Sequence, residues 1–123
     1  MATTLEPPAL GAEAALLRSF ARLQPGWDGY SAAPPTHVVV AAARDFLTAT
    51  AEAETPPDRI APSVVGGIGV TFRRNGHKVY VEFRNTGSIL ALFSDGTTEP
   101  VVEPVDPSEY PEFLARARGY LGE

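Results

Sequence analysis

The dipeptide Asn75-Gly76, set between two stretches of alternating apolar residues, constrains the fold of this chain most strongly. Asn-Gly favours a two-residue type I′ turn, because both residues tolerate positive φ angles. Such a turn also fixes which residues of the two flanking strands face each other, and the pairs on one side are all apolar. These pairs are Phe72 with Val79, Val70 with Val81, and Ile68 with Phe83. Turn chemistry and hydrophobic pattern therefore predict the same antiparallel hairpin.

A third strand is expected after the hairpin, because residues 85–87 (Asn-Thr-Gly) are typical of a three-residue loop with glycine in the left-handed position. This loop would place one alternating set beside the apolar side of the hairpin and the other set beside Tyr80 and Glu82. The first set is Ile89, Ala91 and Phe93, and the second is Leu90 and Leu92. A shift of one residue would exchange the two sets, but either way large apolar side chains share a face with Tyr80.

A fourth strand is predicted from about Thr97 to Val102, with Asp95-Gly96 as a hairpin turn before it. Pro100 suits an edge position in this strand, since proline cannot donate a hydrogen bond to a neighbouring strand.

Apolar residues at helical spacing predict two helices before these strands and one after them. The first covers about residues 9–24, the second begins after the N-cap Thr36 and runs to about residue 50, and the third follows a capping box at 106–109. We therefore expect a single α+β domain over residues 1–123, an antiparallel β-meander of about four strands, with residues 1–8 flexible. The N-terminal helices would cover one face of the sheet, and either the C-terminal helix or a partner would cover the other.

Composition narrows the classes of protein to which the chain can belong. The net charge of −5 argues against bulk adhesion to nucleic acid or anionic membranes. The chain has no cysteine, which excludes disulfides and thiolate zinc sites. We expect a cytoplasmic location and no membrane contact, because neither a signal-peptide pattern nor a long apolar run is seen.

The sequence contains few residues that could act together in catalysis. His37 and His77 are some forty residues apart and have no serine or aspartate partner at a recognisable spacing. Two histidines without clustered carboxylates also make a poor metal site. The glycines at 66–69 lead into a strand and not into a helix, so they do not form a phosphate-binding loop. We therefore expect no catalytic residue, no metal and no cofactor, and predict that the protein is not an enzyme.

A basic cluster lies within the hairpin and is a candidate anion or nucleic-acid contact. Its members are Arg73, Arg74, His77, Lys78 and Arg84. The predicted pairing places Arg73 opposite Lys78, an arrangement of like charges that reduces stability. A charged, solvated hairpin is the alternative interpretation, in which an acidic stretch over residues 95–112 balances the basic charge within the molecule.

Two further groups are candidate partner-binding residues. Trp27, Asp28 and Tyr30 lie in a glycine-containing loop, where aromatic side chains can anchor a partner or fold back over the core. Tyr80, Leu90 and Leu92 would share the second face of the sheet, where apolar residues need either a helix or a partner to cover them.

The loop also carries a resemblance. Trp27-Asp28-Gly29-Tyr30 with Ala32, followed by Pro62 and the Gly66-Gly67-Ile68 strand, resembles a family of small uncharacterised bacterial proteins. Their pattern is a WDG-x-x-A segment followed by a P…GGI…W strand, and here Phe72 stands where that tryptophan is expected. The resemblance covers about residues 16–87 and supports the architecture without implying a catalytic residue.

The leading hypothesis is a non-catalytic protein-interaction module, such as a regulatory, immunity or antitoxin-like partner of another bacterial protein or a homodimer. The second hypothesis is nucleic-acid or anion binding through the basic hairpin 73–84.

Overall fold

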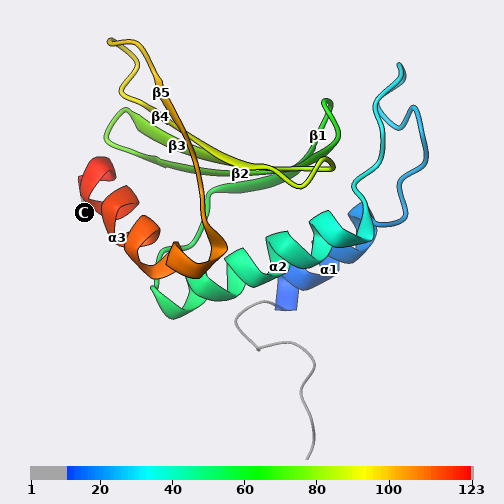
Figure 1. Ribbon diagram of the computed structural model, residues 1–123, viewed down its shortest axis with the longest axis horizontal. Coiled ribbons are helices and arrows are strands. Elements are labelled where there is room, and N and C mark those ends of the chain that lie inside the picture. Colours follow the sequence, from blue (N-terminus) through cyan, green and yellow to red (C-terminus); the bar gives the residue numbers. More distant parts are fainter. Residues whose placement is uncertain (1–10, 123) are drawn as a thin grey trace, which may run out of the picture.

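The computed structural model describes residues 11–122, which form helices on one side of a five-stranded antiparallel sheet (Figure 1). The helices are α1 (Gly11–Phe20), α2 (His37–Glu52) and α3 (Tyr110–Leu121), with the short 3-10 helix η2 (Pro107–Glu109) before α3. The strands are β1 (Arg59–Ser63), β2 (Gly67–Arg74), β3 (His77–Arg84), β4 (Ile89–Ser94) and β5 (Val101–Pro104). They lie side by side in chain order. The flexibility expected for residues 1–8 falls outside the described residues.

The β2–β3 hairpin has the predicted turn and the predicted register. Asn75 and Gly76 have φ angles of 56° and 79°, as a type I′ turn requires. Every predicted pair is present, including the like-charged pair of Arg73 with Lys78. The Asn75 side chain also donates a hydrogen bond to the carbonyl oxygen of Leu121 (3.0 Å), which ties the hairpin turn to the end of α3.

The register of β4 is the first of the two alternatives. Ala91 pairs with Val81 and Phe93 with Val79, so both lie on the buried side of the sheet. Leu92 pairs with Tyr80 on the other side, and Leu90 is opposite Glu82.

The expectation of four strands is wrong by one, because Arg59–Ser63 forms the additional edge strand β1. The last strand is also displaced: it begins at Val101 and not at Thr97, so the two-residue turn at 95–96 is not formed. The Asp95 carboxylate explains this. It accepts hydrogen bonds from the backbone N–H groups of Thr97 (2.9 Å) and Thr98 (2.8 Å), which holds the chain in a wider local turn.

The helices begin and end close to the predicted residues. Thr36 caps α2, accepting a hydrogen bond from the Val39 N–H (3.2 Å), as expected. The first helix is shorter at its C-terminal end than predicted and stops at Phe20. After Phe20 the chain tightens into a turn, in which the Arg22 N–H bonds to the Ser19 carbonyl (3.2 Å) and the Leu23 N–H to the Phe20 carbonyl (3.1 Å).

All three helices pack against the same face of the sheet, so α3 does not cover the second face (Figure 1). Phe46 of α2 lies at the centre of this core and is completely buried. Its ring contacts Phe83 of β3 (5.4 Å between centroids) and Tyr110 of α3 (5.1 Å). Sheet and helices therefore share one hydrophobic core, and the other face of the sheet is turned away from every described helix.

Candidate functional site

The open face is the side of the sheet that points away from the helices, and strand alternation decides which side chains it carries. Its larger side chains come from all five strands. They are Arg59, Thr71, Arg73, Lys78, Tyr80, Glu82, Arg84, Leu90, Leu92 and Val102. Four of these are cations and one is a carboxylate, so the open face has a net charge of +3 on a chain of net charge −5. The open face is thus a basic and apolar island on an acidic protein.

Tyr80 lies at the centre of the open face, with its ring on the backbone of Gly69. A β-carbon added at Gly69 would lie only 2.7 Å from Cε1 and 2.8 Å from Cζ of this ring. Glycine is therefore needed at residue 69 for the ring to lie across β2. Burial, together with the nearby charge of Glu82, raises the pKa of the Tyr80 phenol.

Glu82 is held in place by hydrogen bonds from two strands. The hydroxyl of Ser63 donates to Oε2 (2.6 Å), and Nε of Arg84 donates to Oε1 (3.2 Å). The glutamate side chain is only 12% exposed. Both carboxylate oxygens are therefore engaged within the molecule, and Arg84 is the one open-face cation with an acidic partner among the described residues.

Tyr80 separates two hollows in the open face. The larger, of about 310 Å³, is lined by the side chains of Arg59 and Arg73 together with the hydroxyl-bearing Ser63 and Thr71. The smaller, of about 120 Å³, is lined by apolar residues of β4 and β5 and by Glu82 and Arg84. Its larger apolar side chains are those of Leu90, Leu92 and Val102. The open face therefore has a basic half and an apolar half, joined at Tyr80.

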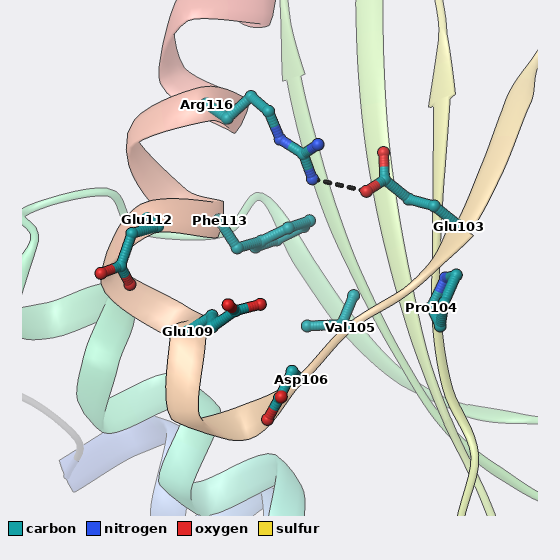
Figure 2. A pocket seen from close by; sticks show the side chains of 8 residues that line it. All are labelled: Glu103, Pro104, Val105, Asp106, Glu109, Glu112, Phe113 and Arg116. Carbon is teal, nitrogen blue, oxygen red and sulfur yellow. Dashed lines mark hydrogen bonds and ion pairs between the residues drawn. The ribbon is translucent and has the colours of Figure 1, made fainter.

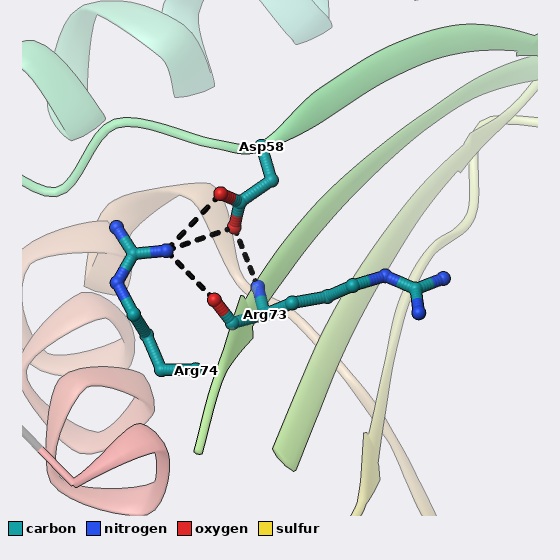
Figure 3. A network of polar contacts seen from close by, with 3 residues as sticks. All are labelled: Asp58, Arg73 and Arg74. Atoms are coloured by element: carbon teal, nitrogen blue, oxygen red, sulfur yellow. Dashed lines mark hydrogen bonds and ion pairs between the residues drawn. The ribbon is translucent and has the colours of Figure 1, made fainter. Parts of the chain in front are cut away.

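The structure divides the basic cluster that was expected from the sequence. Arg73, Lys78 and Arg84 lie on the open face, whereas Arg74 points to the opposite side and pairs with Asp58 (3.1 Å). In Figure 3 the Arg73 side chain extends away from this carboxylate, although its backbone N–H donates to it. His77 packs edge-on against the ring of Tyr120 in α3 (5.1 Å).

Arg59 belongs to the same basic group and was missed, because β1 was not recognised as a strand. It pairs with Thr71, two residues from Arg73 along β2, so β1 brings it beside the Arg73–Lys78 pair. Within residues 11–122, no ion pair is found for the side chains of these three cations.

The aromatic loop does not join the open face. Asp28 accepts hydrogen bonds from the backbone N–H groups of Tyr30 (2.9 Å) and Ala32 (3.2 Å), and Trp27 donates from Nε1 to the Ala33 carbonyl (3.2 Å). These bonds fix the shape of the loop. Of its two aromatic side chains, Trp27 is half-buried, whereas Tyr30 projects from the loop with 87% of its surface exposed.

Asn85 attaches this loop to the end of β3. Its side chain accepts a hydrogen bond from the Thr36 N–H (3.1 Å) and donates one to the Pro34 carbonyl (3.0 Å). The two groups of candidate partner-binding residues, one in the loop and one on the sheet, are therefore parts of different surfaces.

An acidic hollow of about 320 Å³ lies between β5 and α3 (Figure 2). Asp106, Glu109 and Glu112 line it together with the apolar Phe113. An ion pair closes one end, where Nη2 of Arg116 lies 2.6 Å from Oε2 of Glu103. In the described part of the chain, no group of three or more histidine, aspartate or glutamate side chains is arranged to hold a metal ion.

Comparison with protein-family models, with curated proteins and with solved structures finds no match for this chain. Within residues 11–122, no helix combines the length and the apolar character that a membrane-spanning helix needs.

Proposed function

We propose that this protein is a non-catalytic interaction module that binds another protein through the open face of its sheet. The observation that supports this best is the placement of all described helices on the other face. Leu90, Leu92 and Tyr80 remain only half-buried on the open face, and contiguous apolar surface of this kind is typical of binding sites. A regulatory, immunity or antitoxin-like role fits a small module with such a surface.

The edges of the sheet are poorer binding sites than its open face. Directly after β5, the Val105 N–H donates to the Ile89 carbonyl of β4 (2.9 Å). Backbone groups of alternate residues point to opposite sides of a strand, so those of Val102 and Pro104 point away from β4, toward the open edge. At the other edge, the Thr71 carbonyl of β2 points toward β1 and accepts a hydrogen bond from the Asp58 N–H. Arg59, which is opposite Thr71, therefore directs its backbone groups toward β2, and by the same alternation those of Pro62 point away from the sheet. Proline has no N–H to donate, so both edges resist the addition of a further strand.

The polar groups on the sheet favour binding over catalysis. Both oxygens of Glu82 are occupied by Ser63 and Arg84, and His77 lies against an aromatic ring of α3. His37 is exposed at the start of α2, on the helical side of the molecule. Within residues 11–122, neither histidine has a hydrogen bond to a serine, threonine or carboxylate side chain, as a general base acting on a nucleophile would need.

We also propose that the chain shares a scaffold with the small bacterial proteins that it resembles. The residues behind the resemblance have structural roles: Asp28 orders its loop, Ala32 is buried, and a β-carbon at Gly67 would overlap the Phe83 carbonyl. Phe72, which replaces the expected tryptophan, is 1% exposed in the core. The pattern thus marks a loop-and-strand framework.

A capture experiment with the purified protein as bait tests the proposed function. The wild-type protein should retain one cellular protein in a stoichiometric complex, and Leu92→Glu should lose it. Val38→Glu is the matched control, because Val38 is 74% exposed on α2, far from the open face. Equal retention by all three baits, or retention by none, would contradict the proposal.

Nucleic-acid binding through the hairpin 73–84 is the second candidate. It is favoured by one observation, that Arg73, Lys78 and Arg84 share the open face with an aromatic ring on which a base could stack. It predicts a mobility shift of a single-stranded oligonucleotide at low salt, weakened by Arg73→Glu. The absence of any shift would exclude it.

A further inference from the structure

We infer that the segment bound by the open face is acidic, with a carboxylate seated on Arg59, Arg73 and Lys78 and an apolar side chain in the hollow beside Leu90 and Leu92. This inference rests on the proposed function and names the chemistry of its partner. In this inference the basic half of the open face binds the carboxylate, and the apolar half binds the apolar side chain.

The charge arrangement is the first argument. Arg73 and Lys78 are directly opposite each other on neighbouring strands, and Arg59 lies beside them on β1. Like charges at this spacing repel and destabilise the folded chain. The sequence has fifteen acidic residues, yet within residues 11–122 none forms an ion pair with these three side chains. An anionic partner would relieve this repulsion.

The shape of the larger hollow is the second argument. Two guanidinium-bearing side chains, Arg59 and Arg73, line it together with the hydroxyl-bearing Ser63, Thr71 and Tyr80. Guanidinium groups bind carboxylates through paired hydrogen bonds, and the hydroxyls of Thr71 and Tyr80 can donate to the same oxygens, whereas the Ser63 hydroxyl already donates to Glu82. The hollow therefore offers the donors that a carboxylate needs, whereas Arg84 is already paired with Glu82.

The apolar half gives the spacing within the partner. Arg73 on β2 and Val102 on β5 are three strands apart, which corresponds to roughly 14 Å across the sheet. An extended segment covers this distance in about four residues. The bound segment should thus carry a carboxylate and a large aliphatic residue about four positions apart, because side chains of an extended segment alternate and an even separation points both toward the sheet.

Two other occupants fit the observations less well. A nucleic acid could bind the same cations through its phosphates, but phosphates do not bind the apolar half of the open face. The net charge of −5 also repels a polyanion at long range. A second copy could meet these cations with the acidic hollow between its β5 and α3, but such a head-to-tail contact would form rings or filaments, whereas the common symmetric dimer uses the same patch on both copies.

Fluorescence anisotropy with a labelled peptide tests the inference. The probe is a short peptide whose glutamates and leucines are four residues apart. A matched peptide has glutamine for glutamate, and an oligothymidylate of similar length represents nucleic acid. At low salt the acidic peptide should bind, and the glutamine peptide should bind at least about tenfold more weakly. Arg73→Glu and Leu92→Glu should each weaken binding by about tenfold or more, whereas Arg22→Glu, a charge reversal at an exposed residue after α1, should not.

The inference is overturned if the acidic peptide fails to bind, if Arg22→Glu weakens binding as much as Arg73→Glu, or if the oligothymidylate binds more tightly than the peptide. Thermal unfolding checks that the Arg73→Glu variant is folded. We expect it to be folded, because the substitution removes the repulsion between residue 73 and Lys78. The capture experiment separates the two proposals. A cellular partner lost by Leu92→Glu but retained by Arg73→Glu would support the interaction module while contradicting an acidic partner.

Discussion

Replacing Lys78 by glutamate should stabilise the protein, although it removes a cation from the open face. Lys78 is directly opposite Arg73 on the neighbouring strand, so the substitution converts a like-charged pair into an ion pair. Cross-strand charge pairs contribute about 0.2–1 kcal/mol each, with the sign set by the charges. Losing the repulsion and gaining the attraction should together raise the free energy of unfolding by about 0.5–1.5 kcal/mol.

Chemical denaturation at low and high salt measures this effect. Because both side chains are near solvent, the gain should shrink at high ionic strength, where mobile ions screen the pair. Lys78→Gln is the matched control, since it removes the repulsion without adding an attraction and should give about half of the gain. In a thermal scan the full gain corresponds to an increase in Tm of about 2–6 °C for a chain of this size.

The reasoning is refuted if Lys78→Glu is less stable than the wild-type protein at low salt, or if its gain does not depend on salt. Either result would mean that Arg73 and Lys78 do not repel each other in the folded chain. The same variant should bind the acidic peptide more weakly, so stability and binding would change in opposite directions. Such a trade-off is expected where a binding site retains an unfavourable arrangement of charges.

Two further variants test the scaffold. Gly67→Ala should lower the free energy of unfolding by about 4 kcal/mol or more, because its β-carbon would overlap the Phe83 carbonyl of the neighbouring strand. Gly87 is the control, since it also has a positive φ but has no atom within 4 Å of an added β-carbon. Gly87→Ala should lower the free energy of unfolding by only about 1–2 kcal/mol in the same urea titration. Burial, chiefly, raises the pKa of Tyr110 to about 12, whereas the unfolded phenol ionises near 10. The contribution of Tyr110 to stability is therefore complete below about pH 10 and is lost, by up to about 2–3 kcal/mol, as the pH rises to about 12. Tyr110→Phe should reduce this alkaline loss in urea titrations across that range, and an unchanged pH profile would contradict the assignment.

The sequence predicted the central hairpin down to its register because two independent signals agreed. Asn75 and Gly76 allow positive φ angles, and the alternation of apolar residues around them permits only one pairing with a uniform buried side. Side-chain hydrogen bonds beyond the hairpin changed the outcome. The Asp95 carboxylate takes two backbone N–H groups and so delays the start of β5. Local turn composition does not reveal this competition.

The first strand was missed because its own sequence carries little strand signal. Residues 59–63 contain a proline and show no clear alternation, and the strand forms because β2 offers it an edge. Arg59 was missed with it, although it completes the basic half of the open face. A sequence pattern can place a cation within a strand, but only the order of the strands shows which cations meet.

The position of the third helix also could not be predicted. Apolar residues at helical spacing predicted the helix itself, but both faces of the sheet offered apolar residues for it to cover. Phe46 decides between them, because its ring contacts both Phe113 and Tyr110 on the helix side. This choice leaves Leu90 and Leu92 without a covering helix among the described residues.

The accessibility of the open face is the central claim, and single-cysteine labelling measures it directly, because the chain has no cysteine of its own. Leu92 and Ala91 are neighbours on opposite faces of β4; Ala91 is completely buried under the helices. A maleimide should modify the thiol of Leu92→Cys rapidly in the dilute, folded protein, and that of Ala91→Cys only after unfolding. Equally slow modification of both thiols would show that the face is already covered, which contradicts the account.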